Sequence, residues 1–206
     1  DLDGQVGALS GGEKSRLELA RLVHGQANLL MLDEPLGSLD RALRERLTAE
    51  LGTLLRRLGQ AVVHVTHDHD EAFALADRIA VMGDGRLVRV GTPTEVWADP
   101  RSVHAARCLG HENLVDLDGD GGCPLGRLGD GPGTVLVRGD RLIVRPAPPV
   151  GGLVGTIRRT SIRGGRTLLD LDVAGVAIRA WWDGPATVGD RVELVLADGA
   201  VVPLAG

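Results

Sequence analysis

The fold of this chain is decided by a short stretch that reads Leu29-Leu30-Met31-Leu32-Asp33-Glu34. A continuous apolar run of this length predicts a fully buried strand, because a strand covered on both faces needs no polar alternation. Two carboxylates follow directly, and their place at the mouth of a buried strand is costly unless a cation or a buried partner meets them. A magnesium-bound phosphate would meet that need, so we expect phosphate chemistry at this end of the strand.

The residues after this stretch continue the pattern of a parallel sheet. Leucines recur at helical spacing between residues 41 and 58, and Gly59 is placed to end that helix. A second apolar run, residues 61–66, predicts another fully buried strand. Strand, helix and strand in this order imply a parallel crossover unit, and therefore an α/β layer.

His67 follows the second of these strands. Since the carboxyl ends of parallel strands meet at one edge of a sheet, we expect this histidine to emerge beside Asp33 and Glu34. A metal site built from residues 67–70, His-Asp-His-Asp, is a competing interpretation. Adjacent loop residues rarely converge on one ion without ligands from elsewhere, so the first interpretation is preferred.

A glycine-rich turn precedes the first strand and reads Leu9-Ser10-Gly11-Gly12-Glu13. It opens an amphipathic helix expected over residues 10–26, and a helix N-terminus can hold a phosphate through its unpaired N–H groups and its dipole. Lys14-Ser15 is the only Lys-Ser step. It is not a phosphate loop, because Glu13 and Ala8 stand where that motif requires glycine.

Beyond His67, short elements alternate with turns. A short helix is expected over residues 70–76 and a strand over 78–82, with Gly83-Asp84-Gly85 as a hairpin turn into a strand over 86–90. Thr92-Pro93-Thr94-Glu95 combines a capping box with proline at the first helical position, so a helix should start there.

The character of the chain changes after Asn113. Residues 116–132 are rich in Gly, Asp and Pro and are interpreted as a linker or a loop-heavy entry to a domain. The short Val, Leu and Ile runs that follow alternate with glycine turns, which favours a small antiparallel barrel. We expect strands over residues 134–137, 141–144, 153–158, 167–172, 176–180, 191–196 and 201–204. The expected domains are therefore residues 1–112 and residues 113–206.

Composition limits the classes of function. The 206 residues, 43% of them hydrophobic, suffice for one large or two small domains, and no apolar run approaches the roughly 18–20 residues that span a bilayer. The formal net charge of −5 argues against a broad nucleic-acid-binding face, although the arginine-rich residues 157–166 could form a local basic patch. Cys108 and Cys123 have neither zinc-site spacing nor the density of a disulfide scaffold, so a reducing compartment is expected.

Taken together, the motifs closely resemble the second half of an ATP-binding cassette (ABC) ATPase. The resemblance rests on four elements in one fixed order: the turn at residues 9–13, the strand ending in Asp33-Glu34-Pro35, the pair Leu39-Asp40, and Val65-Thr66-His67-Asp68. It covers roughly residues 8–110 and implies a partial P-loop NTPase fold of the ABC type.

The second half of the chain resembles another domain of the same proteins. From about residue 113 it is similar to the transport-associated OB-like (TOBE) domain of bacterial importer ATPases, on the marks Gly155-Thr156-Ile157 and Arg163-Gly164-Gly165-Arg166. Those importers carry spermidine and putrescine, ferric iron, thiamine, molybdate or sugars. The resemblance implies an α/β domain followed by a small all-β OB-like barrel.

The resemblance implies that the glycine-rich turn binds ATP. Its candidate ATP-binding residues are Ser10, Gly11, Gly12 and Glu13. Ser10 and Gly12 would grip the γ-phosphate of ATP bound on the opposite subunit. Asp40 would link the two nucleotide sites across a head-to-tail, two-fold symmetric dimer.

The resemblance implies catalytic roles at the strand ends. Asp33 would orient Mg²⁺, usually through water, and Glu34 would polarise the attacking water as general base. His67 would contact the γ-phosphate and sense its departure. The implied activity is transport-coupled ATP hydrolysis with ATP and Mg²⁺ as cofactors.

The implied partners are a second ATPase subunit, transmembrane permease subunits and, indirectly, a solute-binding protein, with no nucleic acid. The implied location is peripheral, at the cytoplasmic face of the inner membrane. In this family the phosphate loop precedes the glycine-rich turn, so we expect a truncated chain that alone neither binds ATP tightly nor hydrolyses it. We also expect an incomplete sheet with an exposed edge.

Two alternatives stay open. The chain could be a stand-alone regulatory or anion-binding module in which the α/β part is a relic. It could also be an ABC ATPase of DNA repair or translation, which the acidic balance and the barrel tail disfavour.

Overall fold

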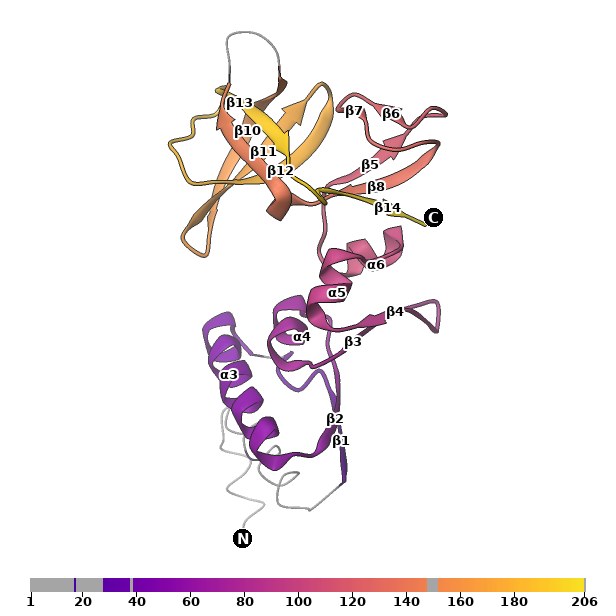
Figure 1. Ribbon diagram of the computed structural model, residues 1–206. Coiled ribbons are helices and arrows are strands. Elements are labelled where there is room, and N and C mark those ends of the chain that lie inside the picture. Colours follow the sequence, from indigo (N-terminus) through magenta and orange to yellow (C-terminus); the bar gives the residue numbers. More distant parts are fainter. Residues whose placement is uncertain (1–16, 18–27, 38, 148–151, 206) are drawn as a thin grey trace. The chain divides into compact units, whose positions relative to one another are not determined.

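The computed structural model describes residue 17 and residues 28–37, 39–147 and 152–205 (Figure 1). The glycine-rich turn and the helix expected over residues 10–26 lie outside the described residues, apart from Leu17. The described part of the chain forms two compact units. One contains the residues up to Ile79 together with Gly91–Pro93, and the other contains Ala80–Val90 and the residues from Thr94 onward.

The first unit contains the predicted crossover. Strand β1 (Leu29–Asp33) pairs in parallel with β2 (Ala61–Val65), and helix α3 (Arg41–Leu58) connects them. Asp40 caps the start of α3, and Gly59, in the left-handed conformation at φ 62°, ends it with an N–H bonded to the Leu55 carbonyl. Helix α4 (His69–Leu75) follows β2.

The expectation that both strands are fully buried is wrong for the described structure. Leu30 and Leu32 of β1 are buried, but Leu29 and Met31 are 51% and 73% exposed. In β2, Val63 and Val65 are likewise about half exposed. Within this unit, the described helices α3 and α4 lie on one face of the two-stranded sheet (Figure 1). Because successive strand side chains point to opposite faces, alternate residues are left in solvent.

Two short strands and two short helices follow. Strands β3 (Ile79–Gly83) and β4 (Arg86–Gly91) form the expected hairpin, with Asp84 and Gly85 both in the left-handed region at its turn. Helix α5 (Pro93–Ala98) starts at the predicted proline. Helix α6 (Val103–Cys108) is capped by the Ser102 hydroxyl. None of the helices that the structure describes is both long and apolar enough to cross a membrane.

The rest of the second unit is built from antiparallel sheets, which confirms the β-rich prediction. A five-stranded sheet has the order β12-β11-β10-β13-β9, and a three-stranded sheet has the order β14-β8-β5. The strands are β5 (Leu114–Leu117), β6 (Gly122–Cys123), β7 (Gly126–Arg127), β8 (Gly133–Val137), β9 (Leu142–Pro146), β10 (Leu153–Arg163), β11 (Arg166–Val173), β12 (Val176–Trp182), β13 (Arg191–Leu196) and β14 (Val201–Leu204), and a 3-10 turn, η1 (Gly139–Arg141), precedes β9.

The interpretation of residues 116–132 as a linker is corrected in part. This segment contains the end of β5 and the small β6–β7 hairpin, and β5 pairs with β8. Both sheets contribute to one hydrophobic core, which contains Val115 of β5, Val135 of β8 and Leu169 of β11. Full burial of such side chains contributes about 1.5–3 kcal/mol each, so this core is the main source of stability for the β-rich part.

Asn113 links the two sheets. Its side chain is buried, its Nδ2 donates to the Arg179 carbonyl at 2.8 Å, and its Oδ1 accepts from the Arg179 N–H at 2.7 Å. Its backbone carbonyl accepts from the Val137 N–H at 2.9 Å. Arg179 belongs to β12, an outer strand of the five-stranded sheet, whereas Val137 belongs to β8.

We predict that Asn113→Ala lowers the free energy of unfolding of this unit by about 1–3 kcal/mol, because two partly buried backbone groups of Arg179 lose their partners. All three tryptophans, Trp97, Trp181 and Trp182, belong to this unit, so urea titration followed by tryptophan fluorescence measures it. The exposed Asp120→Ala is the control. A change of less than about 0.5 kcal/mol for Asn113→Ala would contradict the prediction.

His111 is a buried histidine of the same unit. Its ring stacks on Trp97 with centroids 4.0 Å apart, and its Nε2–H donates to the Trp97 carbonyl at 3.1 Å. Burial lowers the pKa of His111, and this outweighs the opposing effect of the hydrogen bond to Trp97. The neutral imidazole is therefore the form that the fold accommodates.

The stability of this unit should depend on pH through His111. Because the folded pKa lies below the ordinary value of 6.5, the unfolded chain binds more protons in this window. The contribution of His111 is complete above about pH 6.5 and is lost as the pH falls below it. Urea midpoints measured from about pH 7.5 to 5 should fall less steeply for His111→Phe than for the wild type. The exposed His69→Gln should keep the wild-type slope, and equal slopes for all three proteins would contradict the prediction.

Candidate functional site

The ends of β1 and β2 bring the predicted catalytic pair together. Asp33 and Val65 are register partners, and the Glu34 N–H donates to the Val65 carbonyl at 2.9 Å. The Nδ1 atom of His67 is hydrogen-bonded to Oε1 of Glu34 at 2.7 Å. The expectation that His67 emerges at the same sheet edge as the carboxylates is therefore confirmed.

This pair is open to solvent and is presented by a strained turn. The side chains of His67 and Glu34 are 74% and 49% exposed, so both can be reached by a ligand. Glu34 has φ 43°, a left-handed conformation that is uncommon for residues other than glycine. Next to it, Leu36 is fully buried and the Gly37 N–H donates to the Glu34 carbonyl at 3.0 Å. These contacts hold the turn that directs the Glu34 carboxylate toward His67.

Asp33 places an exposed carboxylate beside this pair. It is exposed, and its side chain makes no hydrogen bond or ion pair with another residue that the structure describes. Mg²⁺ is usually held by one or two carboxylates together with water and substrate phosphates, so this donor set fits the ion. Within the described ranges there is no cluster of three or more His, Cys, Asp or Glu residues that could hold a metal ion unaided.

The competing metal site at residues 67–70 finds no support in the described contacts. The Oδ1 atom of Asp68 accepts from the N–H groups of Asp70 and Glu71 and caps α4, and its Oδ2 accepts from Arg44 at 3.2 Å. Partial burial acts to raise the pKa of Asp68, but the bonds from Glu71, Asp70 and Arg44 together hold it below the ordinary value. The carboxylate is thus engaged in the fold as an anion.

Of the remaining predicted site residues, the structure describes Asp40 but not the glycine-rich turn. Asp40 caps α3, with its Oδ1 accepting from the Leu43 N–H at 3.1 Å. Its predicted role between two nucleotide sites stays a prediction. Ser10, Gly11, Gly12 and Glu13 lie outside the described residues.

A polar network behind His67 was not foreseen from the sequence. Glu71 is only 3% exposed, and its Oε2 accepts from the Thr66 hydroxyl at 2.9 Å and lies 3.2 Å from Nε2 of His64. Arg44 of α3 reaches the same carboxyl group, with Nε 3.6 Å from Oε1. The spacing of Asp68 and Glu71 at the start of α4 resembles a capping box, which is the one local signal for this network. Arg44 has no such signal, since an arginine on an amphipathic helix usually faces solvent.

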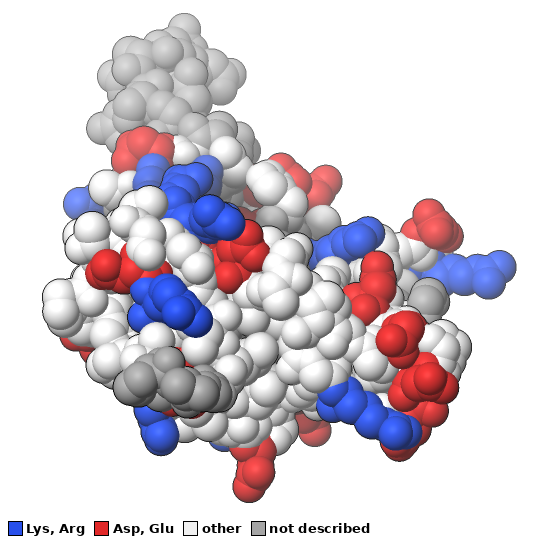
Figure 2. Space-filling model, turned by 90° about the horizontal axis from the view of Figure 1, so that it is seen from above, with Lys and Arg blue, Asp and Glu red and all other residues white. Residues whose placement is uncertain are grey.

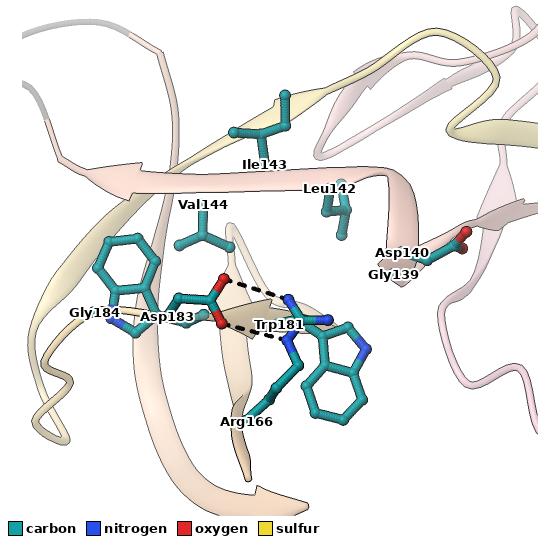
Figure 3. A pocket seen from close by; sticks show the side chains of 10 residues that line it. Gly139, Asp140, Leu142, Ile143, Val144, Arg166, Trp181, Asp183 and Gly184 are labelled. Atoms are coloured by element: carbon teal, nitrogen blue, oxygen red, sulfur yellow. Dashed lines mark hydrogen bonds and ion pairs between the residues drawn. The ribbon is translucent and has the colours of Figure 1, made fainter. Parts of the chain in front are cut away.

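The β-rich part contains a cavity of about 400 Å³ between β9 and β12, the two outer strands of the five-stranded sheet (Figure 3). Leu142 and Val144 lie on one side of it and Trp181 and Asp183 on the other. Arg166 reaches into it and pairs with Asp183, with Nε 3.3 Å from Oδ1, and its guanidinium lies 5.1 Å from the ring centroid of Trp181. The positive charge at this cavity is therefore already neutralised.

Two more arginines of the stretch 157–166, Arg158 and Arg159, also lie near carboxylates. Arg158 donates to Asp172 at 2.6 Å, and Arg159 lies 4.0 Å from Asp170. On the face that Figure 2 shows, positive and negative side chains alternate. These pairs explain how the stretch is accommodated at the surface of a chain with net charge −5.

Comparison with known proteins shows that this chain is similar to import ATP-binding proteins. The family model described as "ABC transporter" matches residues 1–37, which include the glycine-rich turn and the Asp33-Glu34 pair. The Fe(3+) ions import ATP-binding protein FbpC of Streptomyces coelicolor is 44% identical over 217 residues, covering 96% of this chain and 62% of the relative.

Other relatives are named for the import of different solutes. The sulfate/thiosulfate import ATP-binding protein CysA 2 of Chromobacterium violaceum is 38% identical over 82% of this chain and 50% of its own length. The spermidine/putrescine import ATP-binding protein PotA of Thermotoga maritima is 46% identical over 53% of this chain and 30% of its own length. The chain thus spans about three fifths of the Streptomyces relative and less of the others. Along almost its whole length, it is similar to ATP-binding subunits of ABC importers.

Proposed function

We propose that this chain is part of an ABC-type ATPase that energises the import of a solute across a membrane. The observation that carries the proposal is the contact between Glu34 and His67 at the ends of two parallel strands. Its support from outside the structure is the similarity to import ATP-binding proteins.

In the proposed reaction, Glu34 is the general base. Its carboxylate is held by His67 through Oε1, which leaves Oε2 to orient and deprotonate a water molecule that attacks the γ-phosphate of ATP. The Nδ1–H group of His67 donates to this carboxylate, and when both ring nitrogens carry a proton, the Nε2–H group on the other side of the ring can donate to a phosphate oxygen. The two residues thereby hold the general base and the γ-phosphate in a fixed position relative to each other.

Asp33 would hold Mg²⁺ next to this base, in part through water. When bound, Mg²⁺ offsets the negative charge of the phosphates. The exposed carboxylate of Asp33, which has no partner among the residues that the structure describes, supports this assignment.

The proposal extends to an assembly. Ser10, Gly11, Gly12 and Glu13 would bind the ATP of a second subunit in a head-to-tail dimer, with Asp40 between the two sites. The dimer would act as a peripheral subunit on transmembrane permeases at the cytoplasmic face of the inner membrane, with a solute-binding protein as an indirect partner. Residues 113–206 would form a TOBE-like regulatory domain.

Two observations bear on the details. The names of the relatives mention Fe(3+), sulfate/thiosulfate and spermidine/putrescine, so similarity alone does not identify the imported solute. Selectivity for the solute would lie mostly in the other subunits. The cavity of the β-rich part gives no specific support to the alternative of an anion-binding module, because Arg166 in its lining is paired with Asp183.

Substitution of Glu34 tests the proposed reaction. Glu34→Gln in the protein of full natural length, with any residues that precede Asp1, should retain ATP binding and lose about 100-fold or more in kcat, because an amide cannot accept the proton. Phosphate release and fluorescent-nucleotide titration measure the two quantities. Glu45→Gln, which removes an exposed acid of α3, is the control. A wild-type protein that hydrolyses no ATP, or a Glu34→Gln variant with wild-type kcat, would sink the proposal.

Gly37 offers a finer test of the base's position. A Cβ at this residue would lie 3.2 Å from Oε2 of Glu34 and 3.3 Å from its carbonyl oxygen, and the backbone of Gly37 is not in the left-handed region. Gly37→Ala should therefore leave the fold intact, displace the carboxylate by a few tenths of an ångström, and lower kcat by about tenfold. Gly119→Ala, whose Cβ would meet nothing within 4 Å, is the matched control. Equal kcat values in both variants would show that the space beside Gly37 does not matter.

A further inference from the structure

We propose that Arg44 is a positioning residue that ties the loop after Glu34 to the segment after His67, so that the base and the histidine keep their contact. This inference rests on the proposed function and adds to it a residue remote from the reacting atoms. Arg44 lies in the first turn of α3, and its guanidinium contacts both segments.

On one side, Arg44 binds the backbone carbonyls of three residues that follow Glu34, namely Leu36, Gly37 and Leu39. Its Nη2 donates to the carbonyl of Leu39 at 2.9 Å and of Gly37 at 3.3 Å, and its Nε donates to that of Leu36 at 3.3 Å. A planar guanidinium with several N–H donors can bind carbonyls that face one another across a turn. One side chain thus binds three backbone carbonyls of the residues that follow Glu34.

On the other side, Arg44 holds the segment that carries His67. Its Nη1 donates to Oδ2 of Asp68, the residue next to His67, and its Nε lies 3.6 Å from Oε1 of the buried Glu71. The side chains of Arg44 and Asp68 are only 28% and 25% exposed. Partial removal from solvent makes such a charge-assisted contact stronger than an exposed ion pair.

Other arginines of α3 show the contrast. Arg41 and Arg46 pair with Glu45 and Glu50 on their own helix, and all four side chains are more than half exposed. Exposed pairs of this kind contribute little to stability. Arg44 instead contacts residues of two different segments. Leu36 lies 8 positions before it, and Asp68 lies 24 positions after it.

The two held segments flank the catalytic pair. Glu34 is bonded to Val65 through its N–H and to His67 through its carboxylate. If Arg44 is removed, the carbonyls of Leu36, Gly37 and Leu39 and the segment at residues 66–71 lose their common anchor, and the Glu34–His67 geometry should loosen. A lysine cannot replace the anchor, because its ammonium is a compact charge without the planar fork.

The test compares Arg44→Lys, Arg44→Ala and the control Arg46→Ala in the protein of full natural length. For both Arg44 variants we expect kcat to fall by about tenfold or more while KM for ATP stays within about twofold. This pattern is expected when catalytic groups lose their positions in the transition state while ATP binding is kept. We expect Arg46→Ala to match the wild type. Asp68→Asn, which keeps the Oδ1 cap of α4 but removes the charge facing Arg44, should lower kcat in the same direction.

Amide hydrogen exchange provides a readout that does not need activity. In the Arg44 variants, exchange should quicken together at Gly37 and Leu39 in one segment and at Asp70 and Ala72 in the other, with little change in the second half of α3. Uniform quickening across the whole unit would indicate a purely structural role and overturn the proposal. So would wild-type kcat in Arg44→Lys.

The outcomes separate this inference from the proposed function. If the wild-type protein hydrolyses no ATP, the proposed function fails, and the exchange pattern alone decides whether Arg44 couples the two segments. If the wild type is active and Arg44→Ala does not fold, Arg44→Lys and Asp68→Asn decide the question. An active wild type with unchanged kcat in both of these variants overturns the role of Arg44 and leaves the proposed function standing.

Discussion

The candidate site depends on the parallel pairing of β1 with β2. Glu34 and His67 are 33 positions apart, and only this pairing brings the ends of their strands to one edge. The register decides the outcome as well, because a shift of one residue would turn every side chain of a strand to the opposite face. With Asp33 opposite Val65, the next residue of the chain bonds to β2 and its carboxylate meets the histidine.

Next to this pairing, contacts from neighbouring residues stabilise a strained backbone conformation at Glu34. Glu34 holds an uncommon left-handed backbone conformation, and such a conformation persists only where its surroundings determine it. The buried Leu36, the network of Arg44, Asp68 and Glu71, and the caps of α3 and α4 supply those surroundings. Glu34 is therefore exposed to a ligand while Leu36 and Gly37, which follow it, are held in place.

Most of the secondary structure could be predicted, because its signals are local. The leucine spacing and the stop at Gly59 define α3, and the alternation of short apolar runs with glycine turns defines strands β8 to β14. Strand β5 was missed because four residues beside a Gly- and Asp-rich segment carry too weak a pattern. Burial of β1 and β2 was misjudged for a different reason: an apolar run does not say which elements cover each face.

The sequence by itself determined the order of elements, the types of residue at the strand ends and the resemblance that gives them roles, because each of these is encoded in neighbouring residues. Tertiary structure alone decided which distant residues hold these elements in place. Arg44 looks like one more surface arginine of a helix, and Asn113 like a turn residue, until the fold brings Asp68 and Arg179 to them. The physical reason is that a buried polar group must find a partner, and packing of distant segments selects that partner.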